Sequence, residues 1–506
     1  SHRLAFVFGD RQSDELARQE FDGVAADLFW TDRPTEENQT SYELRLESDW
    51  SDSLRSTVGV FYWDGDYTLQ QNTALFNIVN PLMGGAGKDS GNISIADRYA
   101  VNYTASPLYS QEVETTAVFG QVDWDMTERL MLSVGGRWLD EEKEACMTVS
   151  GYPVNPLQTI LGLPAGSVAN TDVAGYDKTL DPYPFLVGGT MIAGSWGENC
   201  PDWASSVYDP SFDGSASFDD FTPRVSAQYG FDNGMAYVTY SEGFRSGGFN
   251  GRASAPDNTG PYDPESVKSW EAGAKFTMFD NKFQLNLAAF TVKYEDKQED
   301  IVKPGEDGQA TLTIVENASS ATMEGLEMDF TWVIAEGLSL RGNVGLLDAS
   351  YDDFLTSSAT GMVDKSSIEL RRAPDMTAGL GMLFERQMAA GHWFVATLNY
   401  TWKDDYYISA TANADHSVAG YIDNPSKVDA FGLLDASINW ETEHFTISLF
   451  GKNLTDETYL MSFLDVGANV VAAGPNDSTP VYAPGSWSFG TPNRPRYFGA
   501  EIQLKF

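Results

Sequence analysis

The chain has 506 residues, of which 42% are hydrophobic and 13% aromatic, and its formal net charge at pH 7 is −41. It contains no apolar run long enough for a transmembrane helix, but membrane-spanning strands remain open because one face of such a strand stays polar. The charge argues against nucleic acid as a partner, since phosphates attract basic surfaces. It fits either acidic loops in a salt-rich or divalent-rich setting or the simple solubility of long loops.

Segments in which apolar and polar residues alternate recur along the chain and predict β-strands. One such segment alone would also fit a soluble sandwich. Here, however, the polar faces carry Arg, Glu, Asp and Asn, and the apolar faces recur too often for one soluble sheet. A lipid-facing apolar band around a wet interior explains both faces. The clearest segments are 130–138, 325–332, 338–346, 434–440, 445–449 and 498–506.

The connections between these segments alternate in length. Short, turn-like ones lie at Asp49–Asp52, Asp125–Glu128, Asp232–Asn233, Asp280–Asn281, Ala335–Glu336 and Glu441–Glu443. Long ones lie near 67–110, 144–216 and 456–493, with others near 247–262, 299–310, 352–370 and 407–426. Short turns at one rim and long loops at the other predict an all-β, transmembrane antiparallel barrel with about 16 strands, the long loops being extracellular. The Trp and Tyr content of these loops favours folded caps over disorder.

The only cysteines are Cys146 and Cys200, which fall in the longest predicted loop. In an oxidising compartment this pair predicts a disulfide that closes the loop, and two unpaired thiols are the alternative.

Other candidate sites are few. Four histidines, at positions 2, 392, 416 and 444, lack the paired spacing of a transition-metal site. Acidic clusters at Asp140–Glu144 and Glu295–Asp300 are candidates for Ca²⁺ or simply a solvated acidic rim. We find no GxSxG motif and no plausible Ser/His/Asp set, so an enzyme is not expected.

Several segments carry a resemblance to a known family when taken in order. They read YVTYSEGFRSGGFN from Tyr237, PESVKSWEAGAKFTMFDNKFQLNLAAFTVKYEDKQ from Pro264, NASSATMEGLEMDF from Asn317, LRRAPDMTAGLG from Leu370, GKNLTDETYL from Gly451 and RPRYFGAEIQLKF at the end. Their order and spacing resemble the barrel domain of TonB-dependent receptors, the active importers of the Gram-negative outer membrane. The resemblance covers nearly the whole chain from about Ser41 onward, apart from the long loops.

The resemblance implies a larger protein. By this resemblance, a family member consists of a plug domain followed by a barrel of about 22 strands. The plug, the TonB-contacting box and about six strands are not found in this chain, and His2–Arg11 resembles a strand about a third of the way round such a barrel. Residues 1–506 then form the C-terminal part of the barrel, and a smaller reclosed barrel is the alternative.

The resemblance also implies partners and site residues. The TonB complex would act through the missing plug, and the barrel-assembly machinery would recognise the last strand through Phe498, Ile502, Leu504 and Phe506; lipopolysaccharide would surround the barrel. Candidates for the substrate path are Arg245, Arg252, Arg371, Arg372, Tyr103, Trp196, Trp203 and Trp487. Alternatively, Arg245 belongs to a framework motif, the Arg371–Arg372 pair binds acidic loops or lipid phosphates, and the aromatic residues pack the loops. Apart from Ca²⁺ at the acidic loops, no cofactor is expected.

Three functions follow for such a barrel. The first is active uptake of a scarce ligand, an iron–siderophore complex before a carbohydrate or another nutrient. The second is a passive, porin-like channel, and the third is a surface-binding structural barrel. The −41 charge would repel an anionic ferric complex unless arginine patches dominate locally. The gene sequence upstream of Ser1 separates the first two, because a plug and a TonB-contacting box support the importer.

Reduction of the predicted Cys146–Cys200 disulfide should weaken ligand binding or loop order while the barrel stays folded, because the crosslink constrains only a loop. Ligand binding and the circular dichroism of the barrel, measured before and after reduction, test this. Loss of the whole barrel on reduction would refute the placement of the disulfide in a loop.

Overall fold

The computed structural model describes residues 1–20, 29–70, 72–76, 102–153, 211–253, 258–303, 312–358, 361–388, 391–408, 426–466, 471–474, 477–481 and 487–505. The strands are β1 His2–Glu20, β2 Phe29–Ser51, β3 Leu54–Gln70, β4 Asn72–Phe76, β5 Asn102–Asp125, β6 Leu130–Pro153, β7 Ser211–Phe231, β8 Gly234–Arg245, β9 Glu265–Met278, β10 Phe283–Lys303, β11 Leu312–Ala335, β12 Leu338–Ser358, β13 Gly361–Asp364, β14 Met376–Gln387, β15 Trp393–Lys403, β16 Tyr406–Tyr407, β17 Lys427–Val428, β18 Phe431–Glu441, β19 Phe445–Lys452, β20 Leu460–Val466, β21 Val471–Gly474, β22 Asp477–Val481, β23 Trp487–Pro492 and β24 Tyr497–Leu504. Among these residues no helix is long and apolar enough to cross a membrane.

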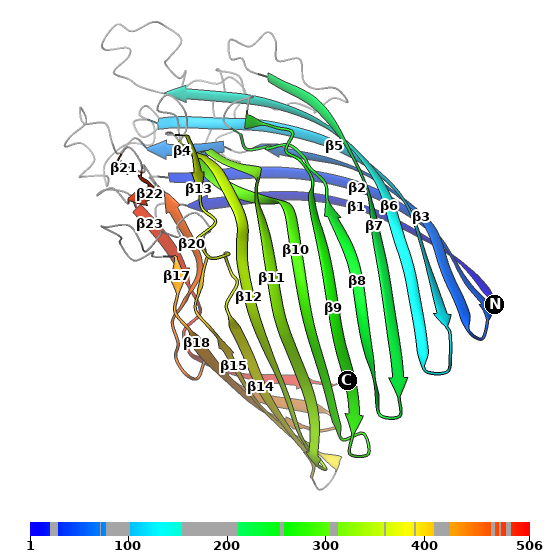
Figure 1. The fold of residues 1–506 in the computed structure, drawn as a ribbon. Coiled ribbons are helices and arrows are strands. Elements are labelled where there is room, and N and C mark those ends of the chain that lie inside the picture. Colours follow the sequence, from blue (N-terminus) through cyan, green and yellow to red (C-terminus); the bar gives the residue numbers. More distant parts are fainter. Residues whose placement is uncertain are drawn as a thin grey trace, which may run out of the picture.

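One 18-stranded sheet dominates the fold, and each long strand pairs antiparallel with the next long strand along the chain. Setting aside the short extensions β4 and β13 leaves 16 strands, the number that the sequence predicts. The sheet curls round on itself, with β1–β3 lying behind β8–β12 (Figure 1). Within the described residues β1 pairs only with β2, and β24 pairs only with β19. The small hairpins β16–β17, β20–β23 and β21–β22 lie outside this sheet.

The six predicted short turns are confirmed, since each separates two paired neighbouring strands. A seventh short connection, between β14 and β15, was not predicted from the sequence. At the opposite rim the strands run beyond the expected loop boundaries: β5 begins at Asn102, and β6 continues to Pro153. Two hairpins occupy parts of the predicted 456–493 loop.

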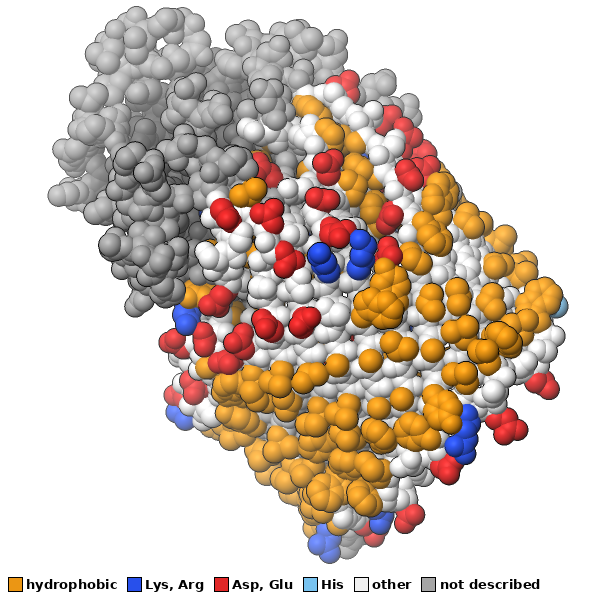
Figure 2. Space-filling model, viewed as in Figure 1, with side chains coloured by type: hydrophobic (Ala, Val, Ile, Leu, Met, Phe, Trp, Pro, Cys, Tyr) orange, Lys and Arg blue, Asp and Glu red, His pale blue; other side chains and the backbone are white. Residues whose placement is uncertain are grey.

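The outer face of the sheet is apolar because the strand register aligns the apolar positions of neighbouring strands. One row runs across β1, β2, β3, β5, β6 and β7 and contains Phe6, Leu44, Val60, Val118, Trp138 and Phe221. All six are exposed, Phe6 at 65% and Phe221 at 56%. Figure 2 shows such side chains gathered into a broad band on the face in view. An apolar face of this extent is the surface expected of a wall in contact with lipid.

The inner face of the same strands is polar. Arg45 alternates with Leu44 on β2, and Arg137 of β6 lies over the ring of Phe61 at 5.2 Å. On β10 and β11 the Asn286 amide donates a hydrogen bond of 2.8 Å to Asp329. These pairs satisfy polar groups that would be costly in lipid, so the polar face lines the interior.

Carboxylates lie on the outer face just beyond the apolar band, towards the long loops. Asp64 of β3 faces Glu114 of β5, and Glu114 in turn faces Glu142 of β6. All three are exposed, and none forms an ion pair within the described part of the chain. Like charges directly opposite each other in neighbouring strands are destabilising, so this rim opposes the folded state electrostatically.

The substitution Glu114→Gln should stabilise the barrel by about 0.2–1 kcal/mol at low salt, because it removes two repulsive cross-strand contacts. Thermal unfolding in detergent micelles measures the change, and the gain should shrink as salt is added. Glu128→Gln, in the exposed β5–β6 turn, is the matched control. A Glu114→Gln protein no more stable than the wild type at low salt would contradict the argument.

Candidate functional site

The connection between β8 and β9, residues 246–264, folds inward against the inner face of the sheet; residues 254–257 lie outside the description. Its Phe249 and Ala253 are 7% and 0% exposed. They pack with Leu69, Tyr109 and Met147, which lie on the inner face of β3, β5 and β6. We call residues 246–264 the inner loop.

Small residues allow the inner loop to approach the wall closely. A Cβ on Gly251 would lie 2.7 Å from the Tyr109 ring, and one on Gly247 would overlap the Tyr262 carbonyl. Neither position leaves room for a side chain. Glycine at these two positions therefore has a packing reason.

Side chains fix the inner loop to the strands on either side. On β11, the Val315 amide donates to Asn250 Oδ1 at 2.7 Å, and Asn250 Nδ2 donates to the Val315 carbonyl at 3.2 Å. Lys143 Nζ of β6 donates to Ser246 Oγ at 2.8 Å and to the Gly247 carbonyl at 2.7 Å. Gln298 Nε2 of β10 donates to the Ser246 and Asp263 carbonyls, each at 3.0 Å. The inner loop is thus held at both ends and in the middle.

Two predicted arginines lie on or beside this loop. Arg245 ends β8 on the face opposite Val238, and it is close to Tyr262. Burial raises the pKa of the Tyr262 phenol, while the charge of Arg245 opposes that shift. Arg252 is exposed and near Arg33 of β2, so that the two charges repel. Arg33 was not predicted as a site residue, although its place on the polar face of β2 was a usable signal.

The structure separates Arg371 from Arg372. One guanidinium nitrogen of Arg371 lies 3.7 Å from Glu299 Oε2 and 3.7 Å from Asp300. Arg372 has a positive φ of 57°, and its amide donates to the Tyr407 carbonyl at 2.7 Å. The two arginines are adjacent in the sequence but contact different residues. Only Arg371 lies beside the carboxylates of Glu299 and Asp300 on β10.

Glu299, one of the two carboxylates beside Arg371, is almost completely buried, with 1% of its surface exposed. The Tyr351 hydroxyl donates to its Oε1 at 2.8 Å, and Lys297 pairs with the same oxygen. Its Oε2 has no hydrogen-bond partner in the described structure. A buried carboxylate is stable only with such partners, yet this one keeps an oxygen turned towards Arg371.

Among the described residues no group of three or more His, Cys, Asp or Glu side chains is placed to hold a metal, and Ca²⁺ at the acidic clusters stays a prediction. Within the first cluster the alternation of the strand separates neighbouring carboxylates. Asp140 and Glu142 point outward, whereas Glu141 points inward and pairs with Lys143 at 3.0 Å. In the second cluster Glu295 pairs with Lys268 at 2.9 Å.

The remaining predicted residues are only partly described. Phe498, Ile502 and Leu504 lie on β24 and are 72%, 67% and 60% exposed, and their role as an assembly signal stays a prediction. Tyr103 and Trp487 lie on β5 and β23, but the description does not extend to their side chains. Cys146 lies on β6 and is not a free thiol. Cys200, Trp196, Trp203 and Phe506 lie outside the described residues, so the disulfide remains a prediction.

The substitution Asn250→Ala should release the middle of the inner loop, because it removes both hydrogen bonds to Val315, at a local cost of about 1–3 kcal/mol. Hydrogen exchange at the Val315 amide should accelerate while exchange in β5 and β6 is unchanged. Asn258→Ala, in the same loop, is the control. Unchanged exchange at Val315 would show that the loop is held without Asn250.

Comparison with known proteins places these features in a family. Residues 3–454 match the family described as TonB dependent receptor-like, beta-barrel. The ferric yersiniabactin uptake receptor FyuA from Yersinia pestis is similar in structure, with a TM-score of 0.64 and 17% identity over 100% of this chain and 58% of that one. The siderophore receptor PiuA from Acinetobacter baumannii has a TM-score of 0.63 and 13% identity, over 99% of this chain and 61% of its own.

A third solved structure, the closed form of the ferric-catecholate import receptor Fiu from E. coli K12, has a TM-score of 0.55 and 16% identity; 99% of this chain and 61% of Fiu are covered. At these identities the likeness concerns the fold. The chain spans 58 to 61% of the length of the three solved receptors.

Proposed function

Because this chain belongs to the TonB-dependent receptor-like β-barrel family, we propose that it forms a large part of the barrel of an active importer for an iron–siderophore complex. The family consists of outer-membrane transporters of Gram-negative bacteria, so the chain is an outer-membrane protein and not an enzyme. In this proposal a plug domain outside the chain closes the lumen, and the TonB complex acts on that plug.

The observation that supports the choice of cargo is that three arginines lie on or beside the inner loop. Arg252 belongs to it, Arg245 is close to its Tyr262, and Arg371 lies 3.7 Å from Asp300, which is also close to Tyr262. Arginine binds carboxylates and other planar anions through paired hydrogen bonds. A local cationic group can attract an anionic ferric complex even though the whole chain carries −41, since fields at short range outweigh distant screened charges. FyuA, PiuA and Fiu are themselves receptors for siderophores or their ferric complexes, which supports the same class of cargo.

Arg371 is suited to exchange partners. Its distance of 3.7 Å from both Glu299 and Asp300 exceeds that of a hydrogen bond. An anionic group of the cargo can therefore take up the guanidinium without breaking a short ion pair. Glu299 keeps Lys297 and Tyr351 as partners when Arg371 turns away, so the buried carboxylate is not left uncompensated. The barrel contributes binding and passage, and the energy for release comes through TonB.

The double substitution Arg252→Ala and Arg371→Ala should weaken binding of the ferric complex by about tenfold or more, because two charge-assisted contacts are lost. Binding of radiolabelled ferric siderophores to whole cells of a gene-deletion strain carrying the variant measures this. Arg386→Ala, at the opposite end of β14, is the matched control.

The same cells separate an importer from a channel. A protonophore should abolish uptake while leaving surface binding intact, because only uptake needs TonB. Uptake that continues in de-energised cells would favour a passive channel. Equal uptake of every ferric siderophore by the deletion strain would remove this cargo class from consideration.

A further inference from the structure

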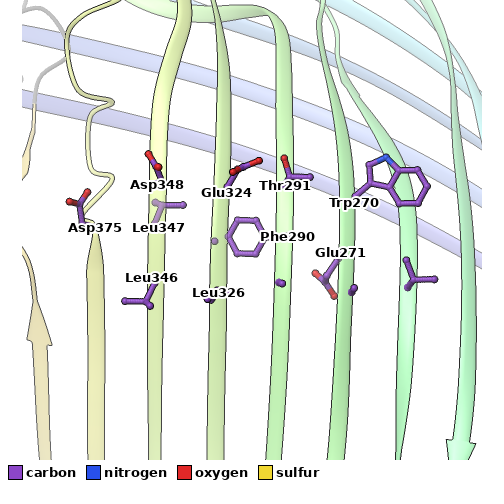
Figure 3. A pocket seen from close by; sticks show the side chains of 14 residues that line it. Trp270, Glu271, Phe290, Thr291, Glu324, Leu326, Leu346, Leu347, Asp348 and Asp375 are labelled. Carbon is purple, nitrogen blue, oxygen red and sulfur yellow. The ribbon is translucent and has the colours of Figure 1, made fainter.

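A groove on the outer face of β8 to β12 is lined in part by Trp270, Ala272 and Ala289 (Figure 3). It opens towards lipid, because the same face carries the apolar band. A ligand that arrives in water instead meets the inner face, at the rim of the long loops. Besides the inner loop and its arginines, a second group of side chains lies at that rim, where β15 ends and β18 begins.

This second group combines aromatic rings with a lysine. Lys403 and Phe431 are the last directly paired residues of β15 and β18, and Lys403 lies on the face opposite the outward Tyr400. Phe431 stacks on Tyr459 with 3.9 Å between the ring centroids and an angle of 9° between the rings. Lys403 Nζ lies 5.3 Å from the centroid of the Tyr406 ring. Three rings and one ammonium group are thus brought together from separate parts of the chain.

Tyr406 connects these rings to an arginine. Burial raises the pKa of the Tyr406 phenol, the nearby Tyr459 adds to that shift, and the charge of Arg372 opposes it. Arg372 is exposed, and its amide donates to the carbonyl of Tyr407, the residue after Tyr406. A guanidinium group therefore joins the ammonium group beside the rings. We call the five residues the rim cluster: Arg372, Lys403, Tyr406, Phe431 and Tyr459.

The polar groups of the rim cluster are not engaged with carboxylates. Within the described part of the chain, Lys403 and Arg372 form no ion pair, and the hydroxyls of Tyr406 and Tyr459 have no hydrogen-bond partner. The neighbouring Lys427, in contrast, has an ion pair of 2.9 Å. The three rings are only half-buried, so part of each is accessible. Two cations and two phenols beside accessible rings suit a ligand that carries negative oxygens on a planar ring.

We propose that the rim cluster binds the iron-chelating group of the cargo, and that this group is a planar aromatic anion of the catecholate type. The inference rests on the proposed function, since it names the chemical class of the same cargo. The ligand ring packs on Tyr406 and Tyr459, and its oxygens accept hydrogen bonds from their hydroxyls. Lys403 and Arg372 pair with the same oxygens. A hydroxamate has no ring and a neutral sugar has no charge, so each would use only part of the cluster.

The test uses the full-length receptor in detergent micelles and radiolabelled ferric complexes of three ligands built on one tripodal amine scaffold. The iron-binding arms are catecholamide, hydroxypyridinone or hydroxamate. The complexes are, in that order, aromatic and anionic, aromatic and uncharged, and uncharged without a ring. Affinity should fall in this order, by roughly tenfold from the first complex to the last.

Equal affinity for the three complexes, or tighter binding of an uncharged one, would overturn the inference and leave the proposed function standing. Failure of all three to bind would overturn it as well. Uptake of ferric siderophores by whole cells then decides separately whether the proposed function holds.

A first variant removes the two cations, Lys403→Gln with Arg372→Asn. Asparagine suits the positive φ of 57° at position 372. Binding of the catecholamide complex should weaken by about tenfold, while binding of the hydroxamate complex is unchanged. Lys293→Gln, on the outer face of β10, is the matched control.

A second variant, Tyr406→Phe with Tyr459→Phe, removes both hydroxyls and keeps the rings, so it alters no packing. The catecholamide complex should bind severalfold more weakly, because two hydrogen bonds to charged oxygens are lost. Tyr229→Phe, on the outer face of β7, is the control. Unchanged catecholamide binding in both variants would contradict the assignment of the site even if the wild type prefers that complex.

Discussion

The two-residue repeat of a single antiparallel sheet is the constraint on which the rest of this structure depends. In lipid every backbone polar group needs a partner within the protein, and strand pairing provides it. Pairing in turn fixes which side chains face lipid: the row from Phe6 through Leu44 to Val60 is outward, and Arg45 is inward. A shift of one residue in register would place Arg45 in the hydrocarbon and Leu44 in the interior, so the sequence pattern specifies the register strongly.

The candidate site depends on a different kind of contact. The inner loop pairs partly with itself, since Gly248 and Tyr262 exchange two backbone hydrogen bonds, and side chains of the wall bond to further backbone groups of the loop. Asn250 imitates a strand by bonding to both the amide and the carbonyl of Val315, while Lys143 and Gln298 hold the start of the loop. These hydrogen bonds act together with the packing of Phe249 and Ala253, which are buried against the inner face of the wall, so polar and apolar contacts both hold the loop in place.

Charged side chains on the outer and inner faces of the sheet have different surroundings. Facing carboxylates such as Asp64 and Glu114 lie at the outer rim, where solvent and salt screen their repulsion. The inner-face arginines lie beside carboxylates that are already engaged, with Glu299 bonded to Tyr351 and Lys297. A net charge of −41 is therefore compatible with a locally cationic cargo path.

The sequence by itself determined the strands, their inward and outward faces, and six of the short turns, because alternation and turn chemistry are local properties of the chain. Alternation also contained an unused signal, because it places Asp140 and Glu141 on opposite faces of β6. The inward folding of the inner loop depends on contacts between residues as distant as Asn250 and Val315, 65 positions apart. The division of Arg371 from Arg372 depends on one backbone angle and on carboxylates from β10. Only the tertiary structure decided these features, because no local pattern records which distant residues the curvature of the sheet brings together.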